Sequence, residues 1–74
     1  MKFYKLIEGL NNEDLRICVY RKYSDNRKES IYNGEIGDIN PTIWDQIETK
    51  RVIKADLCIG EDNKVYLAIR IERS

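Results

Sequence analysis

Hydrophobic and polar residues alternate most regularly in the last third of the chain. The odd positions there are apolar: Ile53, Ala55, Leu57 and Ile59, then Val65, Leu67, Ile69 and Ile71. Successive side chains of a strand point to opposite faces, so this period of two predicts two strands with one apolar face. The sequence therefore predicts a C-terminal β-hairpin whose eight apolar side chains are buried on one side.

The loop of this hairpin must keep both apolar sets on the same face. Directly paired residues have a constant sum of positions, and a slip of one residue would set Leu57 beside a polar partner. A three-residue loop from Glu61 to Asn63 satisfies this condition, and so does a five-residue loop from Gly60 to Lys64. Asn63 tolerates the left-handed conformation that a three-residue loop needs. A hairpin alone cannot bury its face, so we expect the rest of the chain to cover it.

The N-terminal part follows helical and then strand spacing. Apolar residues at positions 3, 6, 7 and 10 share one helix face and predict a short amphipathic helix that ends at Asn11-Asn12. Leu15, Ile17 and Val19 then alternate with polar or small residues, which predicts the first strand.

A turn and a second strand follow. Ser24-Asp25-Asn26 is typical of a turn, and the chain returns through residues 29–36. The apolar positions of this strand change parity between Ile31 and Tyr32. Because glycine within a strand often marks a β-bulge, we expect the bulge at Asn33-Gly34.

The second helix is predicted from its first residues. Asn40 suits the N-cap position and Pro41 the first helical position. Ile39 and Trp44 then occupy the two positions of a hydrophobic staple. We interpret Trp44 as a core anchor.

The complete pattern is helix, strand, strand, short helix, strand, strand. We predict a single compact α+β domain over residues 1–74, with a four-stranded, mostly antiparallel sheet and helices on one face. The other face would carry soft side chains, namely Cys18, Tyr20, Cys58, Tyr66 and Ala68. Such a face could pack on the second helix, on another subunit or on a partner.

Composition narrows the class of protein. Seventy-four residues, 42% hydrophobic and 35% charged, fit one ordinary globular domain. No apolar run approaches the ~20 residues of a membrane helix, and the N-terminal residues lack a signal-peptide pattern, so we expect a cytoplasmic protein. Cys18 and Cys58 form neither a metal motif nor a disulfide framework, and histidine is absent. We therefore expect free thiols, no metal and no cofactor.

Catalytic groups are sparse. Without histidine, neither serine nor cysteine has the base that acyl transfer uses. The four glycines are scattered and form no phosphate-binding loop. Asp38 with Asp45, or Glu61 with Asp62, could act in acid–base or magnesium chemistry. Thirteen acidic residues in 74 make such pairs expected by chance, so we expect a protein that is not an enzyme.

Charge is balanced overall but segregated along the chain. Thirteen basic and thirteen acidic residues give a formal net charge of zero. Residues 16–28 hold five basic residues and one acid, whereas residues 29–48 hold five acids and no base. This segregation predicts two candidate binding surfaces.

The basic candidate surface is the first hairpin and consists of Tyr20, Arg21, Lys22, Tyr23, Arg27 and Lys28. Basic side chains interleaved with aromatics can contact phosphates and stack on bases, which indicates nucleic acid as a partner. The alternative is a solvated turn whose charges prevent edge-to-edge strand pairing.

The acidic candidate surface consists of Glu35, Asp38, Asp45 and Glu48, with Tyr32 as a contact residue. Clustered carboxylates can meet a basic groove on a protein, including a groove that normally holds nucleic acid. The alternative is ordinary solubilising charge.

The order of these features resembles small phage and mobile-element proteins of AT-rich Gram-positive bacteria. The resemblance rests on the amphipathic start, the strand pair, the segment from Tyr32 to Ile39 and the Pro-led helix with Trp44. It covers the whole chain and includes the Lys-, Ile-, Asn- and Glu-rich composition. It implies a compact protein that binds and modulates a host protein, as inhibitors of CRISPR nucleases and other defences do. It assigns no site residue.

We therefore predict a non-enzymatic protein-binding module, in its sharpest form a phage-type inhibitor that occludes a basic surface of a host nucleic-acid-handling protein. A small nucleic-acid-binding regulator that uses the hairpin 20–28 is the first alternative. A homodimeric structural module that uses the soft sheet face is the second. We expect a monomer or homodimer without a membrane partner.

Overall fold

A computed structural model describes residues 1–73. Its elements are α1 (Phe3–Leu10), β1 (Arg16–Lys22), β2 (Lys28–Glu35), the 3₁₀ turn η1 (Ile36–Asp38), α2 (Pro41–Ile47), β3 (Val52–Ile59) and β4 (Val65–Ile71). This order confirms the predicted α+β class with its helix, two strands, short helix and two strands.

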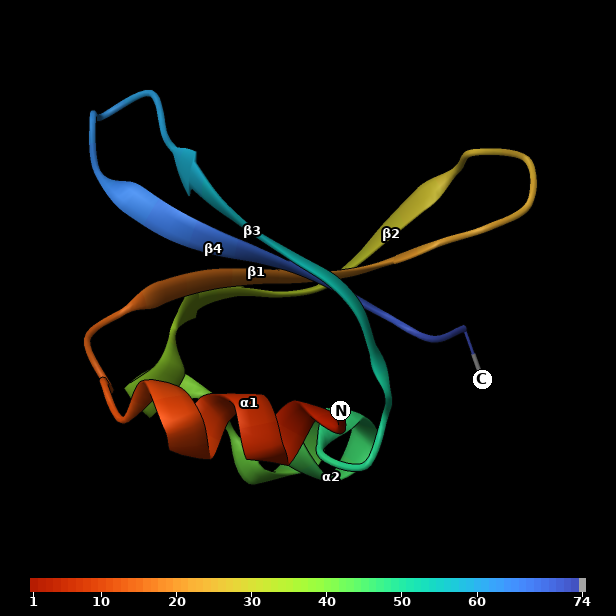
Figure 1. The fold of residues 1–74 in the computed structure, drawn as a ribbon, viewed down its shortest axis with the longest axis horizontal. Coiled ribbons are helices and arrows are strands. Elements are labelled where there is room, and N and C mark those ends of the chain that lie inside the picture. The colour runs from red at the N-terminus through yellow and green to blue at the C-terminus, as the bar shows by residue number, and fades with distance from the viewer. Residues whose placement is uncertain (74) are drawn as a thin grey trace.

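The strands form one mixed sheet in the order β2-β1-β4-β3 (Figure 1). The hairpins β1–β2 and β3–β4 are antiparallel, and β1 and β4 are parallel in the centre. The sheet is therefore mostly antiparallel, as predicted. Its central parallel pair requires a crossover, because parallel neighbours cannot be joined by a tight turn.

Both helices cover the same side of the sheet, which we call the helix face (Figure 1). The core between these layers consists of side chains at most 1% exposed: Phe3, Ile17, Val19, Ile47, Ile69 and Ile71. The rings of Phe3 and Trp44 meet edge to face with centroids 5.8 Å apart, so Trp44 does anchor α1 to α2. The opposite side, which we call the open face, is not covered by any helix of residues 1–73. The second helix therefore does not pack on the open face.

The ends of the helices follow the predicted local rules. Asn11 closes α1 with a positive φ of 45°, and its N–H donates to the Ile7 carbonyl. Asn40 caps α2, since its Oδ1 accepts a hydrogen bond of 2.9 Å from the N–H of Ile43. Among residues 1–73, neither helix is long and apolar enough to cross a membrane.

The β3–β4 loop has the three-residue geometry. The N–H of Gly60 donates to the Lys64 carbonyl at 2.8 Å, and Asn63 has φ of 62°. Leu57 pairs with Leu67, as the parity argument requires. The register from Lys54 to Ile59 and the left-handed Asn63 were predicted correctly, and the loop is the shorter of the two lengths that the sequence left open. An irregularity between Val52 and Lys54 was not predicted.

The predicted burial of this hairpin is wrong at its outer half. Near the loop, Leu57, Ile59 and Val65 are 71%, 72% and 45% exposed. At the other end of the edge strand β3, Ile53 is 46% exposed and lies at the register irregularity between Val52 and Lys54. The two helices, of eight and seven residues, are too short to reach the hairpin tip, which bends away from them (Figure 1). Of the eight apolar side chains, only Ile69 and Ile71, in the second half of β4, are fully buried in the core.

The predicted bulge exists, but its position is wrong. Val19 pairs with Tyr32 and Tyr20 pairs with Ser30, so Ile31 is the extra residue. Gly34 stays in regular register with Ile17. Packing explains the glycine at position 34, because a Cβ there would lie 2.8 Å from the Tyr32 hydroxyl oxygen.

Candidate functional site

Three loops converge at one end of the molecule. The N–H of Gly37 donates to the Glu13 carbonyl at 2.9 Å, which joins η1 to the α1–β1 loop. A hollow of about 360 Å³ at the same end has a lining that includes the acids Asp14, Glu35 and Asp62, the bases Arg16 and Lys64, and Val65. The β3–β4 loop therefore lies beside the other two loops.

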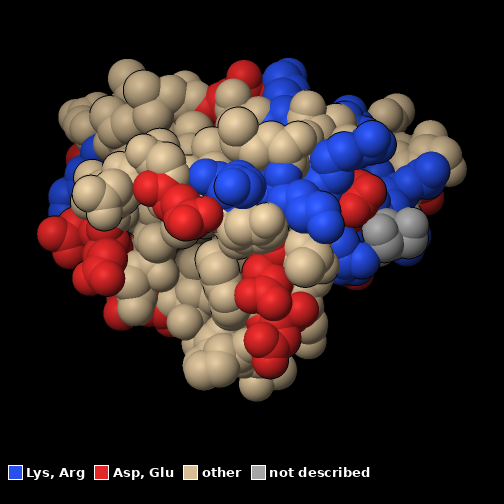
Figure 2. Space-filling model, turned by 60° about the horizontal axis from the view of Figure 1, so that its bottom comes forward, with Lys and Arg blue, Asp and Glu red and all other residues tan. Residues whose placement is uncertain are grey.

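This convergence gathers acids that are distant in sequence. We define the acidic end as Glu13, Asp14, Glu35, Asp38, Glu61 and Asp62. In Figure 2, acidic side chains lie at the left end of the molecule and in a second group below its middle, whereas most basic side chains run across its middle and right. Four of these six acids lie outside the predicted acidic stretch, and only the strand order brings them to it.

Tyr32 belongs to this end, but its hydroxyl is occupied. Its Oη donates to the Glu35 carbonyl at 2.5 Å. Burial raises the pKa of the Tyr32 phenol, and the carboxylates of Asp38 and Glu35 raise it further, while Arg16 opposes them. The nearby carboxylates place Tyr32 among the acids, where it supports the surface.

The other two predicted acids lie elsewhere, on α2 and at its C-terminal end. The Glu48 carbonyl accepts a hydrogen bond of 3.0 Å from Tyr4, at the start of α1. The acidic end instead adjoins the far end of α1, so a helix of eight residues, about 12 Å, lies between them. Asp45 is exposed on α2. The predicted acidic stretch is therefore not one continuous surface.

Exposed apolar side chains adjoin the acidic end. We define the apolar edge as Leu57, Ile59 and Val65. Ile59 pairs directly with Val65 at the base of the acidic loop, and Val65 lines the same hollow as Asp14 and Asp62. Sequence reasoning missed this surface because it assigned all three side chains to the core.

The predicted basic surface is divided between two faces. Arg21 pairs with Glu29 on the helix side of the sheet, with the charged atoms 3.6 Å apart. Lys28 lies over the ring of Tyr20 on the open face, 5.2 Å from its centroid. At the hairpin tip, the Arg27 guanidinium lies 4.7 Å from the centroid of the Tyr23 ring. Arg27 and Lys28 are therefore held against the aromatic rings by cation–π contacts.

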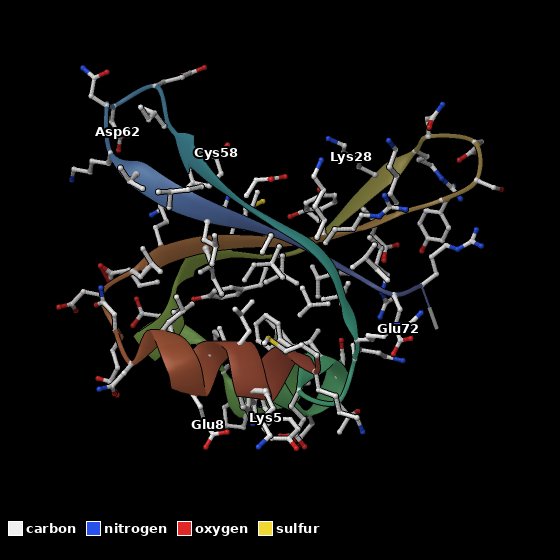
Figure 3. The ribbon with its side chains drawn as sticks, in the orientation of Figure 1. Lys5, Glu8, Lys28, Cys58, Asp62 and Glu72 are labelled. Carbon is white, nitrogen blue, oxygen red and sulfur yellow. The ribbon has the colours of Figure 1, made fainter. Side chains whose placement is uncertain are left out.

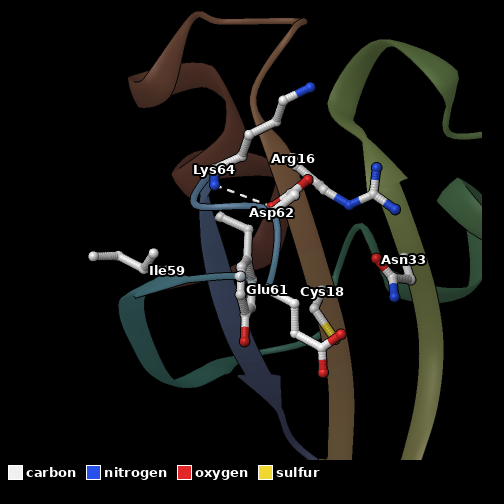
Figure 4. Close-up of a pocket in the computed structure, with 9 residues that line it drawn as sticks. Arg16, Cys18, Asn33, Ile59, Glu61, Asp62 and Lys64 are labelled. Carbon is white, nitrogen blue, oxygen red and sulfur yellow. Dashed lines mark hydrogen bonds between the residues drawn. The ribbon is translucent and has the colours of Figure 1, made fainter.

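The open face contains two adjoining hollows. One, of about 470 Å³, includes Cys18, Tyr20, Lys28, Tyr66 and Ala68 in its lining. The other, of about 680 Å³, continues past Cys18 and Tyr66 to the β3–β4 loop (Figure 4). In that loop, Asp62 accepts a hydrogen bond of 3.0 Å from the N–H of Lys64.

The two thiols lie on this open face and are free. The neighbouring Cys58 raises the pKa of the Tyr66 phenol through its charge and a hydrogen bond, and Cys18 adds a smaller contribution. Over the described residues 1–73, no group of three or more potential ligands could hold a metal ion.

Comparison with known proteins adds no relative to this description. No family model, no curated protein and no solved structure matches this chain. The resemblance to small phage proteins stays a prediction.

Proposed function

We propose that this chain is a protein-binding module that docks its apolar edge and acidic end onto a basic surface of a partner protein. The observation that carries this proposal is the exposure of Leu57 and Ile59, each more than two thirds accessible, next to the loop that carries Glu61 and Asp62. An isolated domain gains nothing from such exposure, whereas a docked domain gains the burial.

The composition of this surface matches that of specific interfaces. Such interfaces have an apolar centre and a polar rim, and a few large side chains supply most of the affinity. Full burial of an aliphatic side chain contributes about 1.5–3 kcal/mol, so the apolar edge supplies part of the free energy that offsets the entropy lost on association.

The acids of the rim select the partner. Carboxylates from three loops steer a basic surface toward this end and disfavour acidic partners. In the sharpest form of the proposal, the partner is a host protein that handles nucleic acid, and the chain is a phage-type inhibitor. It then occupies the basic groove that would otherwise hold phosphates.

The experiment is affinity capture from a nuclease-treated Gram-positive lysate with matched charge reversals. We expect the wild-type chain to retain a stoichiometric protein band, and the double variant Asp38→Lys, Glu61→Lys to lose it. Glu8→Lys is the control, because Glu8 points away from the sheet on the outer side of α1 (Figure 3). Lysine in the last turn of α1 also suits the helix dipole.

Two outcomes contradict the proposal. Equal loss of the band in Glu8→Lys would show that only net charge matters. Retention of the band in the double variant would show that the partner binds elsewhere. Reversal of Asp45 or Glu48 on α2 should have little effect, because both lie outside this surface.

A further inference from the structure

The open face contains like charges in direct cross-strand contact. Lys22 on β1 pairs with Lys28 on β2, and Lys54 on β3 pairs with Arg70 on β4. Like charges directly opposite each other on a sheet are destabilising. Two such pairs on one face therefore cost stability in the free protein, and a bound anion would offset that cost.

These four basic residues surround one aromatic ring. Tyr20 on β1 pairs with Ser30 on one side and with Arg70 on the other. The Lys28 ammonium lies over the Tyr20 ring. Asp56 is the acid in the lining of this hollow, and it lies 3.4 Å from Lys54. The basic charge thus exceeds the acidic charge around Tyr20.

The hollow itself separates two tyrosines. Its floor includes the paired small residues Cys18 and Ala68 of the central strands. Tyr20 and Tyr66 lie in opposite directions along the strands from this pair, and both rings line the hollow. The hollow therefore has a tyrosine ring toward each end, and one of these rings, that of Tyr20, carries the Lys28 ammonium over it.

We propose that the open face binds single-stranded nucleic acid. Lys22, Lys28, Lys54 and Arg70 contact phosphates, and Tyr20 and Tyr66 stack on bases. Aromatic side chains within a basic groove are the features that single strands require. A free phosphate would use the charges but not the rings, and a duplex hides its base faces from stacking. This site meets the acidic end at Tyr66, but its test uses Tyr20 and Lys28 and the other uses Asp38 and Glu61, so either proposal can fail alone.

The test is fluorescence anisotropy with a labelled deoxythymidine oligomer of about twelve nucleotides, a length within the usual site sizes. Four phosphate contacts predict that log K falls with log salt at a slope of about −3. Tyr20→Phe keeps a ring and should bind like the wild type, whereas Tyr20→Val should lose about tenfold in affinity. Valine is a good strand residue, so this variant should still fold.

Charge reversal supplies the second comparison. Lys28→Glu should weaken binding and reduce the salt slope, and Lys5→Glu should do neither. Figure 3 shows Lys28 on the sheet side of the molecule and Lys5 on the outer side of α1. Equal loss in both variants, wild-type binding by Tyr20→Val, or no binding by the wild type would each overturn the proposal. Equal competition by a duplex or by inorganic phosphate would also overturn it.

Discussion

At the scale of single residues, Gly34 leaves space for the large side chain of Tyr32. The Tyr32 hydroxyl oxygen lies where a side chain on Gly34 would be, and it donates to the Glu35 carbonyl. That hydrogen bond fixes the end of β2 and with it the start of the acidic end. Glycine is therefore required at position 34 by the position of the Tyr32 side chain and not by the backbone conformation of Gly34.

Two glycine substitutions test this reading. Gly34→Ala should destabilise the fold by about 1–3 kcal/mol, because its Cβ forces the Tyr32 ring to move. Gly9→Ala is the control, since nothing lies within 4 Å of its Cβ and it is helical. It should stabilise by about 0.5–1 kcal/mol. Chemical denaturation measures both, and equal effects of one sign would refute the packing argument.

At the scale of elements, the two hairpins share one loop design. Asn26 and Asn63 have φ of 68° and 62°, in the left-handed region. In each loop the preceding aspartate accepts a hydrogen bond from a backbone N–H two residues later, that of Arg27 or Lys64. The Asp-Asn pair thus sets both registers by local chemistry. This is why sequence alone predicted both turns.

Substitution of Asn63 tests the loop design. Asn63→Val should destabilise the hairpin by about 1–2 kcal/mol, because a β-branched residue is strained at positive φ. Asn63→Gly should be neutral or nearly so, since glycine adopts this conformation freely. Thermal or chemical unfolding measures the difference. A valine variant as stable as the glycine variant would contradict the left-handed geometry.

At the scale of the whole molecule, strand order decides which residues meet, and sequence pattern does not encode it locally. The helices, caps and strands follow from spacing and could be predicted. The parallel pairing of β1 with β4 could not, and it brings loops 13–14, 35–38 and 61–62 to one end. The exposure of Leu57 could not be predicted either, because the alternation of apolar and polar residues shows which face of a strand is apolar but not how far a helix covers that face.

The apolar edge gives the most direct test of the central claim, that this end of the molecule binds a protein. Leu57 and Ile59 are largely exposed in the free chain, so Leu57→Thr with Ile59→Thr should leave the free energy of unfolding nearly unchanged. The measurement is capture of the partner from nuclease-treated lysate by this double variant and by wild type. We predict that the variant folds normally and loses the partner band. A folded variant that captures the same band as wild type would contradict the account.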